Sequence, residues 1–157
     1  MRPPRIRGLR LVRLENRPAP ADRGFSASVS ISPGDGLDFD DGADRALDAG
    51  DFDPSTHGVS ITDRLLVLVN RVATLLEPKH PDTLLGLLAY VNFTRAPLRE
   101  PVHRNVVPVI APITYCRQRP FTDSACPGAD AFRQLVESWR KKTRLLGYYG
   151  YLYNLAE

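Results

Sequence analysis

Carboxylates and other polar side chains that follow apolar runs are the residues of this sequence whose types and spacing could do chemistry. The clearest example is Asp35, which comes after an alternating run that ends in Pro33-Gly34. Proline and glycine end strands, so this aspartate is delivered into a loop, where it could act as a general acid or bind hydroxyl groups. Asp40 and Asp41 lie close behind it and are its candidate partners. The alternative is turn chemistry, because Pro-Gly-Asp-Gly is also an ordinary turn composition.

Further polar side chains stand at or just after the ends of three later apolar runs. They are Tyr90, Asn92, Arg95, Tyr115, Arg117, Tyr151 and Asn154. In β/α barrels the reactive groups lie where strands end and loops begin, so these residues are expected to share one rim with Asp35. A tyrosine offers an apolar ring with a polar tip, which suits a ligand that has both kinds of surface. The alternative for the tyrosines is simple packing in a β-rich interior.

Hydrophobic periodicity predicts the elements that must position these residues. Strands are expected at 25–32, 83–91, 105–112 and 145–153, and amphipathic helices at 60–77 and 129–144. Strands that alternate with helices favour right-handed parallel β/α units, so the predicted class is α/β with about four parallel strands and two main helices. Four strands are too few to close a barrel. Residues 25–157 form the predicted domain, and residues 1–24 form a basic, weakly structured arm.

Three details of the predicted helices involve polar or aromatic residues. Ser60 with Asp63 three residues later resembles a capping box at the start of the first helix. Asn70 falls off the apolar stripe of that helix, together with two arginines, and is predicted to face solvent. Trp139 shares one face of the second helix with Phe132 and is predicted to be a core residue, with a ligand platform as the alternative.

An aspartate-rich segment at 36–58 separates the first strand from the first helix. It is predicted to be a long loop with short helical turns near 43–49. Asp38, Asp40 and Gly42 begin like a calcium loop, but the glycine is one position early and Ala49 stands where a bidentate glutamate is needed. The three histidines are scattered as well, so neither a metal site nor a cofactor is predicted.

Composition and charge exclude several classes of function. The net charge is +3, with seven arginines in residues 1–23 and eight aspartates in residues 35–53. The basic arm has no interleaved aromatics and no nucleic-acid-binding motif, so no nucleic-acid partner is predicted. No apolar run reaches the roughly 18 residues of a membrane span, and no signal segment is recognisable, so we expect a soluble chain. Cys116 and Cys126 could form one bridge or remain two thiols.

Several stretches, taken together, resemble a known bacterial family. They are the run 63–73, His80-Pro-Asp82, Leu88-Ala-Tyr90, Tyr115-Cys116, Cys126, Trp139, the tyrosine-rich strand 147–151 and the strand end Ser32-Pro-Gly-Asp35-Gly. Over roughly residues 25–157, their order and spacing are similar to the family catalogued as domain of unknown function 4838. That family is regarded as a glycoside-hydrolase-like (β/α)8 barrel, also called a TIM barrel.

The resemblance implies a partial barrel whose intact form acts on, or binds, an oligo- or polysaccharide at the strand-end rim. Glycoside hydrolysis needs two carboxylates, so Asp35, Asp40 and Asp41 become the implied catalytic residues and the other rim side chains the implied sugar-binding ones. Barrel strands on both sides are absent, so we expect a fragment that needs the missing part or self-association to cover its open edges. The alternatives are a non-catalytic carbohydrate-binding remnant and a truncated product with no independent function.

Overall fold

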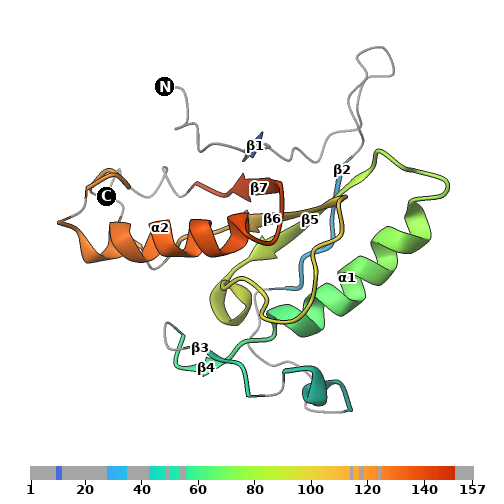
Figure 1. Ribbon diagram of the computed structural model, residues 1–157, viewed down its shortest axis with the longest axis horizontal. Helices are drawn as coiled ribbons and strands as arrows, with labels where there is room; N and C mark the ends of the chain where they lie inside the picture. Colours follow the sequence, from blue (N-terminus) through green and yellow to red (C-terminus); the bar gives the residue numbers. More distant parts are fainter. Residues whose placement is uncertain are drawn as a thin grey trace.

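A parallel sheet is the centre of the fold (Figure 1). The computed structural model describes residues 10–11, 28–34, 43–48, 50–53, 56–113, 115–116, 119–123 and 125–150. In this part of the chain four parallel strands lie side by side in the order β2 (Ser28–Ser30), β5 (Leu84–Ala89), β6 (Val106–Ile110) and β7 (Leu145–Tyr148). The predicted α/β class with four parallel strands is therefore confirmed. Within the predicted arm, β1 (Arg10–Leu11) pairs in parallel with the other edge of β7.

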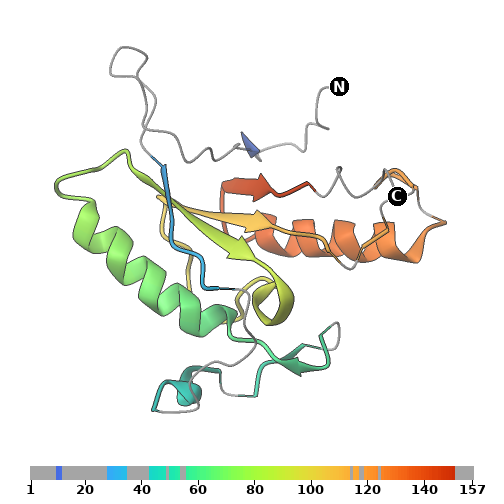
Figure 2. The same ribbon diagram turned by 180° about the vertical axis from the view of Figure 1, so that it is seen from behind.

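Two helices, α1 (Thr62–Leu76) and α2 (Pro127–Arg140), cover the same face of the sheet, as Figure 1 and Figure 2 show. Alternate residues of a strand point to one face, and this periodicity explains the arrangement. Leu85 and Leu87 of β5 belong to the apolar cluster under α1, whereas Ala89 belongs to the cluster under α2. These three residues share a face, so both predicted helices lie on one side of the sheet.

The sheet stays open over the described residues, with β1 and β2 at its two edges. From β2 to β7 the strands follow one another in space in the same order as in the sequence. Each strand is thus added in the same direction, and the two α-helices, which lie in the β2–β5 and β6–β7 connections, cover the same face. Neither α1 nor α2, the two α-helices of the described part, has the length and apolar character needed to cross a membrane.

The predicted capping box at the start of α1 is wrong. The helix begins at Thr62, and its N-cap residue Ile61 makes no side-chain cap hydrogen bond. The hydroxyl of Ser60 lies 3.0 Å from that of Thr62 instead. Asp63 does not return to the helix terminus because its carboxylate accepts backbone N–H bonds from the connection between β5 and β6.

Asn70 of α1 also contacts the β5–β6 connection, so the prediction that it faces solvent is wrong. Its Nδ2 donates a hydrogen bond to the carbonyl of Pro101 at 2.8 Å, and its Oδ1 accepts one from the backbone N–H of His103 at 3.0 Å. The connection contains no α-helix that could shield its backbone groups. Side chains of α1 satisfy those groups instead and fix the connection against the helix.

The described parts of the aspartate-rich segment, residues 43–48, 50–53 and 56–58, contain regular secondary structure. A 3-10 helix, η1 (Ala43–Asp48), confirms the helical turns predicted near 43–49. It is followed by an antiparallel hairpin of β3 (Phe52–Asp53) and β4 (Gly58–Val59), which the sequence did not indicate. A second short 3-10 helix, η2 (Val91–Phe93), follows β5. The hairpin and η2 together provide the polar groups discussed below.

We predict that Gly147→Ala lowers the free energy of unfolding by about 1–3 kcal/mol. Gly147 of β7 lies opposite Val109 of β6, and a Cβ at position 147 would stand 2.8 Å from Val109 Cγ2 and 3.3 Å from its Cβ. Valine is stiff at χ1, so it has little freedom to withdraw. Urea unfolding followed by circular dichroism measures the effect.

Gly34→Ala is the matched control, because a Cβ at Gly34 would meet no atom within 4 Å. The double variant Gly147→Ala with Val109→Ala should regain part of the lost stability, since the second change removes the colliding methyl groups. A Gly147→Ala chain as stable as the Gly34→Ala chain would contradict the prediction.

Candidate functional site

The candidate site lies where β5 and β6 end, beside the β3–β4 hairpin (Figure 1). The hairpin is joined to this edge because the backbone N–H of Ser60 donates to the carbonyl of Asp51, and that of Ile61 donates to the carbonyl of Asn92. The predicted rim residues that the structure describes here are Tyr90, Asn92, Arg95 and Tyr115. The structure adds two carboxylates from the hairpin, Asp51 and Asp53, both of which are buried.

The chain leaves β5 through a strained turn. Tyr90 is still extended, and its ring meets that of Phe93 edge-on with the ring centroids 6.5 Å apart. Val91 then adopts a φ of 46°, a left-handed conformation that costs a β-branched residue about 1–3 kcal/mol. This reversal starts η2 and places Asn92 so that its Oδ1 is buried and accepts no hydrogen bond from any described residue. Strained backbone and unsatisfied buried acceptors are features that gather at ligand sites.

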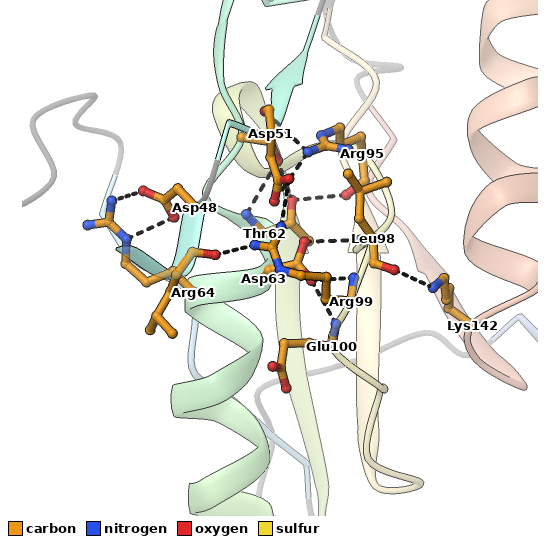
Figure 3. A network of polar contacts seen from close by, with 12 residues as sticks. Asp48, Asp51, Thr62, Asp63, Arg64, Arg95, Leu98, Arg99, Glu100 and Lys142 are labelled. Atoms are coloured by element: carbon orange, nitrogen blue, oxygen red, sulfur yellow. Dashed lines mark hydrogen bonds and ion pairs between the residues drawn. The ribbon is translucent and has the colours of Figure 1, made fainter. Parts of the chain in front are cut away.

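Arg95, which is predicted to bind sugar, contacts the segment that leads into the hairpin. Its Nη2 donates to the carbonyl of Asp51 at 3.2 Å and lies 3.6 Å from the carboxylate of the same residue (Figure 3). Arg99 contacts the other oxygen of that carboxylate at 2.8 Å. Asp51 is therefore held by two arginines, and Arg95 secures the hairpin to the strand ends.

Tyr115, just beyond β6, brings a hydroxyl to the site. Burial raises the pKa of this hydroxyl above its usual value, and the negative charge of the nearby Asp53 raises the pKa further. Tyr115 is consequently a neutral hydrogen-bond donor over the whole physiological range. Its ring meets Phe132 of α2 edge-on with centroids 5.5 Å apart, which fixes its direction. The arrangement places a phenolic donor within electrostatic range of Asp53, a carboxylate that is 3 % exposed.

Asp53 is the site residue that sequence reasoning did not select. Strand alternation places it on the buried side of the hairpin, while its neighbour Phe52 is 60 % exposed. This inverts the usual pattern, in which the aromatic residue would be buried. The Asp-Phe-Asp alternation ahead of Pro54 and Gly58 was the available signal for a short hairpin.

Several predicted site residues lie outside the described residues. They are the candidate catalytic Asp35, Asp40 and Asp41 and the candidate binding residues Arg117, Tyr151 and Asn154. Of the predicted rim, the structure thus describes Tyr90, Asn92, Arg95 and Tyr115, which follow the ends of β5 and β6. Over the same described residues, no group of three or more His, Cys, Asp or Glu side chains is placed to hold a metal ion.

The arrangement offers complementary hydrogen-bonding groups at one sheet edge. Tyr115 donates, Asn92 Oδ1 and Asp53 accept, and Tyr90 adds an aromatic face. A ligand rich in hydroxyl groups could use all of them, because each hydroxyl both donates and accepts.

Comparison with known proteins gives one match. A family model described as "Domain of unknown function (DUF4838)" matches residues 26–157, which is most of the chain. No curated protein and no solved structure matches the chain.

Proposed function

The chain belongs to the DUF4838 family, and we propose that it is part of a glycoside-hydrolase-like β/α barrel whose strand-end rim binds an oligo- or polysaccharide. The strand order and the position of the helices support the barrel. Strands added in sequence order, with every helix on one face, are what each half of a (β/α)8 barrel requires. Ligands of such barrels bind at the carboxyl ends of the strands, where the candidate site lies.

The observation that carries the proposal is the set of polar groups at this edge, namely the neutral Tyr115 hydroxyl, the buried carboxylate of Asp53 and the buried Asn92 Oδ1. A donor and an anionic acceptor at one edge of the sheet suit the hydroxyl groups of a sugar. Tyr90 offers a ring against which the C–H face of a sugar could pack. Asn92 supplies a further buried acceptor.

Hydrolysis would need a second carboxylate at catalytic distance from the first. In the proposed reaction Asp53 joins Asp35, Asp40 or Asp41, which follow the end of β2 in the sequence. The second candidate function is carbohydrate binding without turnover. It is favoured by the ion pairs of Asp51 with Arg95 and Arg99, which engage one of the two buried carboxylates described at the rim.

We predict that Asp53→Asn and Tyr115→Phe each weaken carbohydrate binding about tenfold or more, because each removes a hydrogen bond that involves a charged or buried group. Calorimetry with neutral and uronic-acid oligosaccharides measures the affinity. Asp82→Asn is the matched control for Asp53→Asn, since Asp82 is exposed and lies just before β5, at the opposite end of the strand.

Turnover of aryl-glycosides and uronic-acid oligosaccharides separates the two candidate functions. Hydrolysis that Asp35→Asn or Asp53→Asn abolishes would support the first. Binding without turnover would support the second. Affinities unchanged in both rim variants, or no binding of any carbohydrate by the folded chain, would overturn the proposal.

A further inference from the structure

Cys116 and Cys126, the two cysteines of the chain, flank the connection from β6 to α2. Cys126 is the N-cap residue of α2 and is buried, and its carbonyl accepts the backbone N–H groups of Ala129 and Asp130 at 3.0 and 3.1 Å. Cys116 is half-buried and directly follows Tyr115. Both residues carry a thiol in this structure rather than a disulfide.

Gly128 shows how closely Cys116 approaches the start of α2. A Cβ at position 128 would stand 3.0 Å from the backbone nitrogen of Cys116 and 3.1 Å from its Cβ. Only a glycine leaves room for this contact, so Cys116 rests on the first turn of the helix, two residues along the chain from Cys126. A disulfide requires Cβ atoms roughly 3.5–4.5 Å apart, and the contact of Cys116 with Gly128 places both cysteines at the same end of α2.

We propose that Cys116 and Cys126 form a reversible disulfide that fastens the β6–α2 connection to the N-terminus of α2. The half-buried Cys116 is the thiol that an external oxidant reaches, and the buried Cys126 is the thiol that resolves the intermediate. The pair closes a short loop of the chain at the N-terminus of α2.

The oxidant is a small disulfide of the glutathione class, and the reaction balances in two exchange steps. The Cys116 thiolate attacks one sulfur of glutathione disulfide, which forms a mixed disulfide and releases one glutathione thiolate. The Cys126 thiolate then attacks the Cys116 sulfur, which forms the intrachain bond and releases the second glutathione. Two protein thiols are oxidised with loss of two protons, and one glutathione disulfide is reduced.

The disulfide would also act on the rim, and this consequence rests on the proposed function. Tyr115 precedes Cys116 and packs on Phe132 of α2. Tying position 116 to the helix restricts the Tyr115 backbone, so its hydroxyl is held in place before a ligand arrives. Pre-organisation of this kind lowers the entropic cost of binding. The oxidised chain should therefore bind the carbohydrate several-fold more tightly than the reduced chain.

Peptide mapping of the full chain in glutathione redox buffers tests the disulfide. Trypsin cleaves after Arg104, Arg117 and Arg133, so Cys116 and Cys126 fall in separate peptides, 105–117 and 118–133. In the oxidised wild type these two peptides should appear as one linked species that separates on reduction. Cys126→Ser should instead accumulate a glutathione adduct on Cys116, and Cys116→Ser should react much more slowly.

Independent glutathione adducts on both cysteines, with no linked peptide at any redox ratio, would overturn the disulfide. The mapping needs no ligand, so its result does not depend on the proposed function. A disulfide that leaves the carbohydrate affinity unchanged would overturn the coupling to the rim. Absence of carbohydrate binding in both redox states would overturn the proposed function and leave the disulfide standing.

Discussion

Asp63→Asn is expected to lower the free energy of unfolding by about 3 kcal/mol. The Asp63 carboxylate is 2 % exposed and accepts backbone N–H bonds from Leu98, Arg99 and Glu100 at 3.0, 2.8 and 2.7 Å (Figure 3). An asparagine keeps one acceptor oxygen and turns an NH2 group towards these donors. At least one buried backbone N–H then loses its partner, and a repulsive contact between two hydrogen-bond donors replaces a hydrogen bond.

Urea unfolding at neutral pH measures the loss, with Asp82→Asn as the matched control. Asp82→Asn is the same chemical change at an exposed position, so it should alter the free energy of unfolding by less than about 0.5 kcal/mol. Equal midpoints for the two variants would show that the three N–H groups find other partners, which would contradict the expected result.

The contribution of Asp63 should also depend on pH. Burial raises the pKa of its carboxyl group, but the three backbone N–H donors and the charge of Arg99 outweigh burial, so the pKa lies below the ordinary value of 3.8. A carboxyl group whose pKa is depressed by folding stabilises the protein fully above its unfolded pKa and loses that effect as the pH falls through the folded pKa. The stability difference between wild type and Asp63→Asn should therefore be constant at neutral pH and shrink below about pH 4.

The connection between β5 and β6 explains why α1 carries these polar residues. A parallel pair usually needs a long crossover with its own α-helix, and here a segment without an α-helix crosses instead. Asp63 and Asn70 satisfy the backbone groups of the segment from one side, and Lys142, just after α2, donates to the carbonyl of Leu98 at 3.2 Å. Side chains on α1 and just after α2 thus make the hydrogen bonds to this connection that a crossover helix would otherwise make within itself.

The strands and helices were predictable because burial sets a period that the sequence repeats. Continuous apolar runs predicted β5 and β6, and apolar residues repeating with the 3.6-residue period of a helix predicted α1 and α2. Tyr90, Asn92 and Tyr115 followed from strand ends alone, since parallel strands share one carboxyl edge. The predicted boundaries ran past the observed ones at most termini, because strand and helix ends are set by local hydrogen bonds that periodicity does not encode.

The hairpin and the ion pairs of Arg95 could not be predicted in the same way. Asp51 is buried because Arg95 and Arg99, 44 and 48 residues further along the chain, reach it. No local pattern encodes a contact over that separation. From sequence alone, an aspartate-rich segment is therefore predicted to be a solvated loop. Its burial becomes clear only when the three-dimensional structure shows the arginines that neutralise its carboxylates.

Trp139→Ala is expected to lower the free energy of unfolding by about 3–5 kcal/mol, the usual cost of deleting a large buried aromatic side chain. Trp139 is 0 % exposed and lies in the cluster between α2 and the sheet, which confirms it as a core residue. Its Nε1 donates a hydrogen bond to the carbonyl of Thr94 at 2.8 Å. Phe52→Ala is the control, because Phe52 is largely exposed and should cost far less.

Trp139→Phe separates the two contributions of the indole and remains informative if Trp139→Ala does not fold. Phenylalanine fills most of the volume but leaves the buried Thr94 carbonyl without its donor, so an intermediate loss of about 2 kcal/mol is expected. Thr94 follows η2 and precedes Arg95, so this hydrogen bond also connects α2 to the strained exit of β5. Circular dichroism in urea measures both variants. A Trp139→Phe chain as stable as wild type would contradict this expectation. It would mean that the Trp139 hydrogen bond does not contribute to stability and that packing alone fixes the segment after β5.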